Sequence, residues 1–111
     1  MKTQYFHFSN DFKGKSGIVT LAAKSNGEKK EVIKVGFALT PPDSKFDKEK
    51  AKKEALKVME SNQCSVMVGR ASTGKMGDTA RLVWGSAILT CYDLPKWAKK
   101  LDLGMKAHVI K

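Results

Sequence analysis

The chain has 111 residues, of which 21 are Lys or Arg and 11 are Asp or Glu, so its formal net charge is +10. This length fits a single domain, residues 1–111, with a core that needs no disulfide or metal to fold. The composition, 41% hydrophobic and 29% charged, excludes a disordered chain. No apolar run approaches the roughly 20 residues of a transmembrane helix. The first residues contain no apolar signal-peptide core, so we expect a small basic protein of the cytoplasm.

Lysine carries almost all of the positive charge, because only Arg70 and Arg81 are arginines. A lysine is a flexible point charge, which favours diffuse attraction to a polyanion over the base-specific readout that arginine performs. An A+T-rich coding sequence together with a solubility surface would give the same composition. The net charge is +4 over residues 1–42, +1 over residues 43–63 and +5 over residues 64–111. The excess therefore lies outside the middle segment.

A three-stranded antiparallel meander is predicted at the beginning of the chain. Residues 3–8 alternate in character, which places Phe6 and Phe8 on one face of a strand. The second and third strands are predicted at residues 18–24 and 31–39. The segment between them contains Asn-Gly, which predicts a tight type I′ hairpin turn.

One main helix is predicted after the meander. Two consecutive prolines end the third strand, because proline cannot donate to a β-ladder. Ser44 and Asp47 then resemble a capping box, and Ala51, Ala55 and Met59 recur at the spacing of a buried helical face. The lysines of this helix are nearly balanced by acids, so a solvated face is favoured over a nucleic-acid-binding one.

The rest of the chain is predicted to add two strands and a short helix. Residues 64–68 fit a short strand, and residues 69–79 form a Gly-rich loop. Residues 81–91 are strongly apolar and fit either a strand or a buried helix. Their bounding turns and their β-branched and aromatic residues favour a strand. A short helix follows from residue 95 to residue 101, and residues 107–110 could form a final edge strand.

This order of elements indicates an α+β fold built on a compact antiparallel β-meander. The order is strand, strand, strand, helix, strand, strand, followed by a short C-terminal helix. It resembles an OB-fold, a partly open five-stranded barrel with a helix between the third and fourth strands. A sheet with helices on one face fits the same order.

The Gly-rich loop at residues 69–79 begins with a match to G-x-x-x-x-G-K. A phosphate-binding P-loop next requires Ser or Thr to hold Mg²⁺, and its lysine opens a helix. Here Met76 follows, Met-Gly-Asp-Thr is a poor helix start, and only 36 residues remain for the rest of an NTPase. We interpret the segment as a flexible loop that carries Arg70 and Lys75. Its amides could still hold a phosphate, or it is an ordinary exposed loop.

No catalytic, metal or cofactor site is predicted. His7 and His108 are the only histidines, and the acidic residues sit at predicted turns and caps. Cys64 and Cys91 match no zinc or redox spacing, and we expect buried, reduced thiols, with a disulfide between neighbouring strands as the alternative. We therefore expect a protein that is not an enzyme and needs no cofactor.

Two Gly-rich loops carry the clearest indication of a binding surface. In an OB-like order the first and fourth inter-strand loops flank one binding face, and here both loops are basic. An exposed aromatic that stacks on a base contributes about 1–3 kcal/mol. Tyr5, Phe12 and Trp84 are the candidates for this role, whereas the core is expected to take Phe6, Phe37, Phe46 and Trp97. The predicted nucleic-acid-binding residues are Lys13, Lys15, Lys29, Lys30, Lys34, Arg70, Lys75, Arg81, Tyr5, Phe12 and Trp84.

These features favour a protein that binds nucleic acid, single-stranded or without sequence preference, through lysines and a few aromatics. The alternative is a small host-takeover or anti-defence protein that binds and inhibits an acidic host protein through an electrostatic and apolar surface. Aromatics exposed in a basic groove would favour the first. An exposed apolar patch, around Trp84 or Met105, would favour the second.

One segment also resembles a known group of proteins. Residues 35–48, which run Val-Gly-Phe-Ala-Leu-Thr-Pro-Pro-Asp-Ser-Lys-Phe-Asp-Lys, resemble a G-x-A-x-x-x-P-x-D-x-F-x-K stretch of small bacteriophage accessory proteins. The resemblance implies a virus-encoded protein of the host cytoplasm and transfers no catalytic residue. In physical terms the same residues are a strand end, a proline stop and a helix cap.

Overall fold

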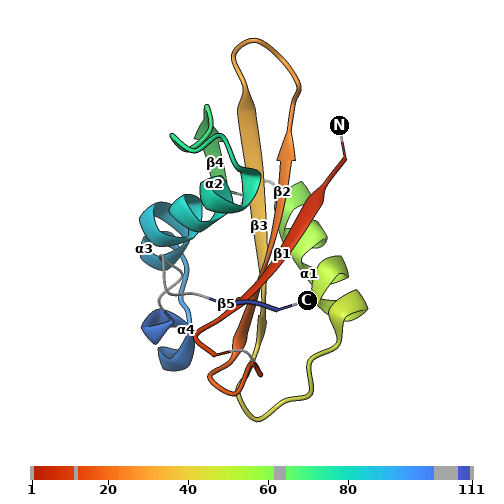
Figure 1. The fold of residues 1–111 in the computed structure, drawn as a ribbon, viewed down its shortest axis with the longest axis vertical. Coiled ribbons are helices and arrows are strands. Elements are labelled where there is room, and N and C mark those ends of the chain that lie inside the picture. The colour runs from red at the N-terminus through yellow and green to blue at the C-terminus, as the bar shows by residue number, and fades with distance from the viewer. Residues whose placement is uncertain (1, 12, 62–64, 102–107, 111) are drawn as a thin grey trace.

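Within the residues that the structure describes, five strands form one antiparallel sheet (Figure 1). The computed structural model describes residues 2–11, 13–61, 65–101 and 108–110. The strands are β1 (Gln4–Ser9), β2 (Ile18–Ser25), β3 (Val32–Thr40), β4 (Ser65–Val68) and β5 (His108–Val109). Their order is β4-β3-β2-β1-β5, so β4 and β5 lie at opposite edges of an open sheet. The α+β class and the initial meander are confirmed, whereas OB-like closure is not seen in this arrangement.

Helices cover both faces of the sheet (Figure 1). Helix α1 (Lys48–Glu60) packs on one face. On the other face lie α2 (Met76–Val83), the π-helical segment η1 (Trp84–Ile88), α3 (Leu89–Cys91) and α4 (Lys96–Lys100). The alternative prediction, a sheet with helices on one face only, is therefore wrong. Because both faces are covered, β2 is buried along almost its whole length.

Helix α1 lies unusually close to β3, and Gly36 makes this possible. Ala55 and Met59 form part of the buried side of the helix. A Cβ added to Gly36 would lie 2.2 Å from the carbonyl oxygen of Ala55 and 2.3 Å from the amide nitrogen of Met59. Only a residue without a Cβ allows the two backbones to approach so closely.

The larger part of the core lies between the sheet and the C-terminal helices. Phe37 of β3 meets Trp84 edge to face, with ring centroids 6.0 Å apart. The two aromatic residues join the sheet to η1. The buried apolar side chains of this cluster are Phe8, Val19, Leu21, Ala23, Ile33, Val35, Met76, Ala80, Val83, Trp84, Ile88, Leu94, Ala98 and Leu101.

The predicted strand at residues 81–91 is wrong, because this segment is helical. It continues α2 through η1 into α3 and ends at Cys91. Ala80, Val83 and Ile88 are buried against the sheet, whereas Leu82 is exposed. A strongly apolar run with one buried side fits a helix on a sheet as well as it fits a strand, and the tertiary packing selects the helix.

Two local predictions at turns are also wrong. The β2–β3 connection spans residues 26–31, and only Gly27 in it has a positive φ, so the turn is not type I′. Instead, the Asn26 side chain accepts hydrogen bonds from the amides of Glu28 and Val32, both at 3.1 Å. At α1 the N-cap is Asp47, whose carboxylate accepts the Lys50 amide at 3.1 Å, so no capping box starts at Ser44.

Candidate nucleic-acid interface

The two basic loops that the sequence groups together lie at opposite ends of the sheet. The β1–β2 loop, residues 10–17, is at the lower end in Figure 1. The loop that follows β4 lies beside the β2–β3 hairpin at the upper end, where the Gly69 amide donates to the Glu31 carbonyl at 2.8 Å. The molecule extends 42 Å along its longest axis. These loops therefore do not flank a common face, and that prediction is wrong.

The β1–β2 loop is organised by one carboxylate. Asp11 accepts hydrogen bonds from the amides of Lys13 and Lys15, each at 2.9 Å, and from Ser16. These bonds, the one from Lys15 first, lower the pKa of Asp11 to about 2. The side chains of Lys13 and Lys15 remain exposed. Phe12, the predicted stacking residue of this loop, lies outside the described residues.

Trp97 provides the aromatic side chain at this end. It belongs to α4 and is partly buried, and its ring packs on Gly17 of the β1–β2 loop, which has a φ of 98°. A Cβ added to Gly17 would lie 2.4 Å from the ring. The prediction that Trp97 is a core residue is correct only in part. Sequence reasoning missed that Trp97 has lysines on both sides along α4, with Lys96 before it and Lys99 and Lys100 after it.

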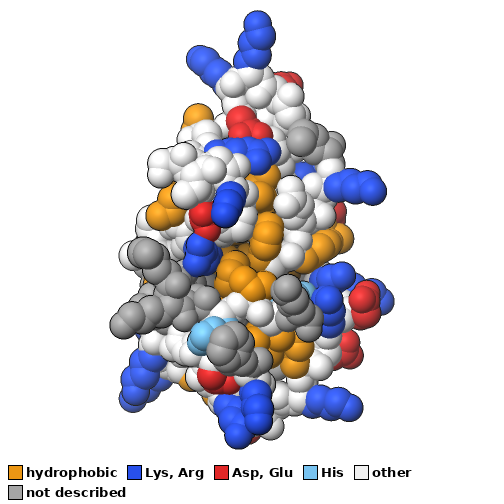
Figure 2. Space-filling model, viewed as in Figure 1, with side chains coloured by type: hydrophobic (Ala, Val, Ile, Leu, Met, Phe, Trp, Pro, Cys, Tyr) orange, Lys and Arg blue, Asp and Glu red, His pale blue; other side chains and the backbone are white. Residues whose placement is uncertain are grey.

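Lysines flank Trp97 along α4 and also occur in the loop on which its ring packs. Lys96, Lys99 and Lys100 are all exposed. The loop on which Trp97 packs contributes two further exposed lysines. We call Lys13, Lys15, Lys96, Trp97, Lys99 and Lys100 the tryptophan end. Figure 2 shows lysine and arginine side chains projecting at both the upper and the lower end of the molecule.

At the upper end, Arg70 is committed to an ion pair. Its Nε donates to Glu31 at 2.8 Å, and its Nη2 donates to the same carboxylate at 3.1 Å. A third bond, from Nη1, reaches the Gly74 carbonyl at 3.2 Å. The pairing lowers the pKa of Glu31. Arg70 therefore braces the hairpin against the loop, and Lys75 beside it is exposed.

Three other predicted lysines also lie at the upper end. Lys29 and Lys30 are exposed in the β2–β3 hairpin, and Lys34 is exposed on β3. Lys34 is directly opposite Lys24 of β2. Like charges in this position are unfavourable unless an anion or a partner screens them. The upper end is therefore basic, although no aromatic residue was found to accompany these lysines in the described chain.

The remaining predicted site residues are structural. Trp84 is 1% exposed, so its predicted exposure is wrong. Arg81 donates to Asp78 and lies over the Phe8 ring, with Cζ 5.5 Å from the centroid. Tyr5 is partly buried against α1, with the Lys52 amine 5.5 Å from its ring centroid. None of these side chains presents a free stacking face or fork.

The P-loop-like segment does reach a helix, because α2 begins at Met76. The prediction that Met-Gly-Asp-Thr starts a helix poorly is therefore wrong. Two of the loop amides, however, are already engaged within the fold. Those of Ala71 and Gly74 donate to Thr79 Oγ1 at 3.0 Å and to the Ala71 carbonyl at 2.8 Å. Met76 also lacks the hydroxyl that would hold Mg²⁺, so the loop resembles a P-loop in its glycine and lysine spacing and in its place before a helix, but not at the metal-binding position.

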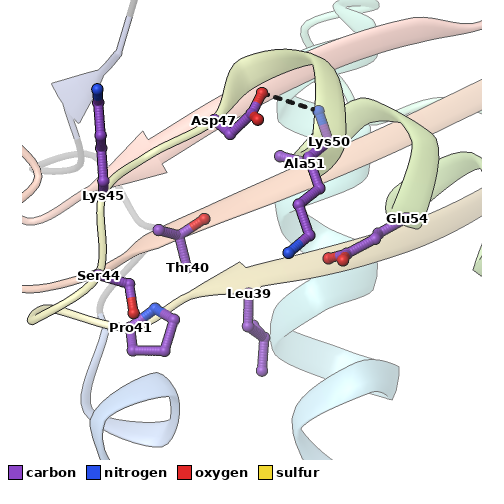
Figure 3. Close-up of a pocket in the computed structure, with 9 residues that line it drawn as sticks. All are labelled: Leu39, Thr40, Pro41, Ser44, Lys45, Asp47, Lys50, Ala51 and Glu54. Carbon is purple, nitrogen blue, oxygen red and sulfur yellow. Dashed lines mark hydrogen bonds between the residues drawn. The ribbon is translucent and has the colours of Figure 1, made fainter.

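A small pocket lies where β3 passes into α1 (Figure 3). It has a volume of about 160 Å³. Its polar lining mixes the amines of Lys45 and Lys50 with the carboxylates of Asp47 and Glu54. Because opposite charges alternate there and Asp47 already caps the helix, the pocket has no net preference for an anion.

His7 is the other buried polar group near α1. Its Nδ1 lies 2.8 Å from Thr20 Oγ1, and its ring meets Phe46 edge to face. Burial, followed by the charges of Lys48 and Lys52, lowers its pKa to about 4. The ring is enclosed and neutral, so it is not presented to a ligand.

No group of His, Cys, Asp and Glu that could hold a metal ion occurs among the described residues. Cys91 is exposed, contrary to the expected burial, while Cys64 and Met105 lie outside the described ranges. No helix in the described part of the chain is long and apolar enough to cross a membrane. Comparison with protein-family models, curated proteins and solved structures finds no match to this chain.

Proposed function

We propose that this protein binds nucleic acid without catalysis, with a preference for single strands and little sequence specificity, through the tryptophan end. The observation that carries the proposal is the position of Trp97 on Gly17, between the lysines of α4 and those of the β1–β2 loop. A base stacks on an aromatic side chain while nearby lysines contact the phosphates. In keeping with the bacteriophage resemblance, the ligand would be met in a host cytoplasm.

The arginines support binding without sequence readout. Base-specific recognition in the major groove relies mainly on arginine forks directed at guanine. Arg70 holds Glu31 and Arg81 holds Asp78, so both guanidinium groups are engaged within the fold. Lysine contacts to phosphates carry no sequence information. OB-fold proteins bind a nucleic-acid strand through loops that lie beside stacking aromatics. We assign the same kind of contact to one end of an open sheet in this protein.

The proposal is tested by fluorescence anisotropy with a labelled oligo(dT) strand and with a duplex of equal length, over a series of salt concentrations. Binding by counterion release makes the logarithm of the affinity fall linearly with the logarithm of the salt concentration. We expect the single strand to bind more tightly and to quench the fluorescence of Trp97. Trp84 is buried and serves as the internal reference. An affinity that barely changes with salt would contradict the proposal.

A matched pair of variants locates the surface. Lys99→Glu with Lys100→Glu reverses two charges beside Trp97, and we expect a loss of at least about tenfold in oligo(dT) affinity. Lys53→Glu with Lys57→Glu makes the same change in net charge on α1. If the α1 control loses as much affinity, net charge alone drives binding and the tryptophan end is not the site.

The alternative function, binding of an acidic host protein, is favoured by a different observation. The apolar patch expected around Trp84 is absent, because that ring is buried. Instead, Val66 and Val68 of the edge strand β4 are exposed. This surface is at the upper end, away from Trp97, and a protein partner there is compatible with nucleic acid at the tryptophan end.

A further inference from the structure

The edge strand β4 exposes apolar side chains in an otherwise charged surface. Val66 is 51% exposed and Val68 is 75% exposed. Both side chains point to the face of the sheet that carries α1, because Val66 pairs with Lys34 and Val68 with Val32. Their neighbours along β4, Ser65 and Met67, point to the opposite face of the sheet and are partly buried. Two valines are thus presented side by side to solvent.

The backbone of β4 has free hydrogen-bonding groups at the same two residues. The Gly69 amide donates to the Glu31 carbonyl, so these residues form a hydrogen-bonded pair of the β3–β4 ladder. In an antiparallel ladder such pairs alternate with non-hydrogen-bonded ones. Met67 therefore turns its polar backbone groups toward β3, whereas Val66 and Val68 turn theirs toward the open edge.

This edge lacks the usual protection against strand pairing. Proteins commonly blunt an edge strand with lysine, proline or a bulge. The β4 sequence Ser-Val-Met-Val contains neither a charge nor a proline. Two of its four residues are β-branched valines, which favour extended pairing. The outer side of β4 has no paired strand among the residues that the structure describes.

The charges next to this edge are positive. Lys24, Lys34 and Val66 form one row across β2, β3 and β4 on the same face. Within the described chain, no ion pair was found for either lysine. Lys29 and Lys30 lie in the hairpin just beyond the end of β4 at which Gly69 meets Glu31. The hairpin also carries two acids, Glu28, which is exposed, and Glu31, which is already held by Arg70.

We propose that the edge of β4 binds an extended, acidic polypeptide segment that adds a sixth strand to the sheet. The outward backbone groups of Val66 and Val68 would pair with the segment, and the exposed valines would receive its apolar side chains. Carboxylates of the segment would then face Lys24, Lys34 and the hairpin lysines. The positive charge also argues against a second copy of this chain, since each copy carries +10.

The proposal goes beyond nucleic-acid binding and uses a separate surface. It is tested with labelled synthetic peptides in which valine and threonine alternate between flanking glutamates. The comparison peptides have lysine flanks, or a central proline that cannot donate to the ladder. We expect the acidic peptide to bind at least about tenfold more tightly than either comparison peptide. Equal binding of the acidic and the lysine-flanked peptides would overturn the proposal, as would no binding at millimolar concentration.

A matched substitution separates this edge from exposed apolar surface in general. Val66→Glu places a negative charge on β4 at a residue that is 51% exposed, and Leu82→Glu does the same on α2, where Leu82 is also 51% exposed. We expect only Val66→Glu to weaken binding of the acidic peptide, by at least about tenfold, because it removes an apolar contact and repels the carboxylates. Folding is checked for both variants by thermal unfolding. Equal effects of the two variants would contradict an edge-strand site.

Amide hydrogen exchange gives a readout specific to strand addition. On peptide binding, the amides of Val66 and Val68 should become protected, while that of Met67 should change little because it faces β3. Protection of Val66 and Val68 in the free protein at high concentration would indicate a second copy and overturn the proposal. Oligo(dT) should leave the bound peptide in place, because the tryptophan end is a separate surface from β4. Displacement of the peptide by oligo(dT) would assign β4 to nucleic acid instead and overturn the proposal.

Discussion

At the residue scale, His7 is a buried base kept neutral by its surroundings. It is 4% exposed, it contacts Thr20 and Phe46, and Lys48 and Lys52 lie close enough to repel its charged form. Its pKa of about 4 lies below the value of 6.5 for a free side chain. At pH values between these two pKa values, His7 is protonated in the unfolded chain and neutral in the folded chain.

His7 therefore makes stability fall as the pH is lowered. The contribution is complete above pH 6.5 and is lost progressively toward pH 4, and the total loss is roughly 3 kcal/mol in the free energy of unfolding. We expect urea unfolding to show much of this loss between neutral pH and about pH 5. His7→Asn, which places an amide near the position of Nδ1, should remove the dependence in this range.

A control comes from the acids. Hydrogen bonds lower the pKa of Asp11 to about 2, and those of Glu31 and Asp78 are also lowered. The stabilisation that these carboxylates give to the folded state is lost mainly below about pH 5, under the range in which the His7 variant is tested. An His7→Asn variant that keeps the wild-type slope between neutral pH and about pH 5 would show that another group is responsible.

At the scale of elements, the contact between α1 and β3 depends on Gly36. A methyl group there would meet backbone atoms of Ala55 and Met59, which cannot move without shifting the helix. We expect Gly36→Ala to reduce the free energy of unfolding by about 3 kcal/mol or more, because close-packed backbones cannot relax around an added group. The measurement is urea unfolding followed by tryptophan fluorescence.

Gly85 supplies the matched control for this substitution. A Cβ at Gly85 would meet nothing within 4 Å, and the residue lies in the helical run on the opposite face. Gly85→Ala should stabilise the protein by about 0.5–1 kcal/mol, because alanine restricts the unfolded chain and favours the helix. If the two substitutions have similar effects, close backbone approach is not what fixes glycine at position 36.

The sequence predicts the meander and α1 well because their patterns are local. Alternation in residues 3–8, the proline stop and the Ala51, Ala55, Met59 spacing each report one element by itself. The prediction for residues 81–91 fails because a strongly apolar run fits either a helix or a strand, and the choice depends on a sheet formed by distant residues. The spacing of Ala80, Val83, Trp84 and Ile88 does contain the helical period, and this is the signal in the sequence that favours a helix.

At the scale of the whole molecule, the candidate site could be predicted only in part. Lys13 and Lys15 are exposed as expected. The sequence does not show which loops lie close together, so it wrongly predicts that Arg70 and Lys75 share a binding face with these two lysines. The antiparallel course of the strands places these loops at opposite ends. Trp97 was assigned to the core because hydrophobicity alone cannot distinguish a buried ring from one seated on a glycine at the surface.

The separation of the two ends gives a prediction about charge. The long axis of 42 Å greatly exceeds the screening length of about 8 Å in physiological salt. Lys13→Glu with Lys15→Glu should lower oligo(dT) affinity at least about tenfold, whereas Lys29→Glu with Lys30→Glu should change it less than about threefold. Anisotropy at one fixed salt concentration checks this. A similar loss in both double variants would mean that the polyanion responds to total charge.

The pairing of β5 with β1 also sets the order in which the fold is completed. Phe8 and Ser9, near the start of the chain, pair with Val109 and His108, near residue 111. During synthesis β1, β2 and β3 can assemble as they leave the ribosome, but this side of β1 stays unpaired until residues 108–109 emerge. The nascent chain therefore carries an open strand edge while the roughly 100 residues between these two strands are synthesised, and that interval is when this edge is exposed to misassembly.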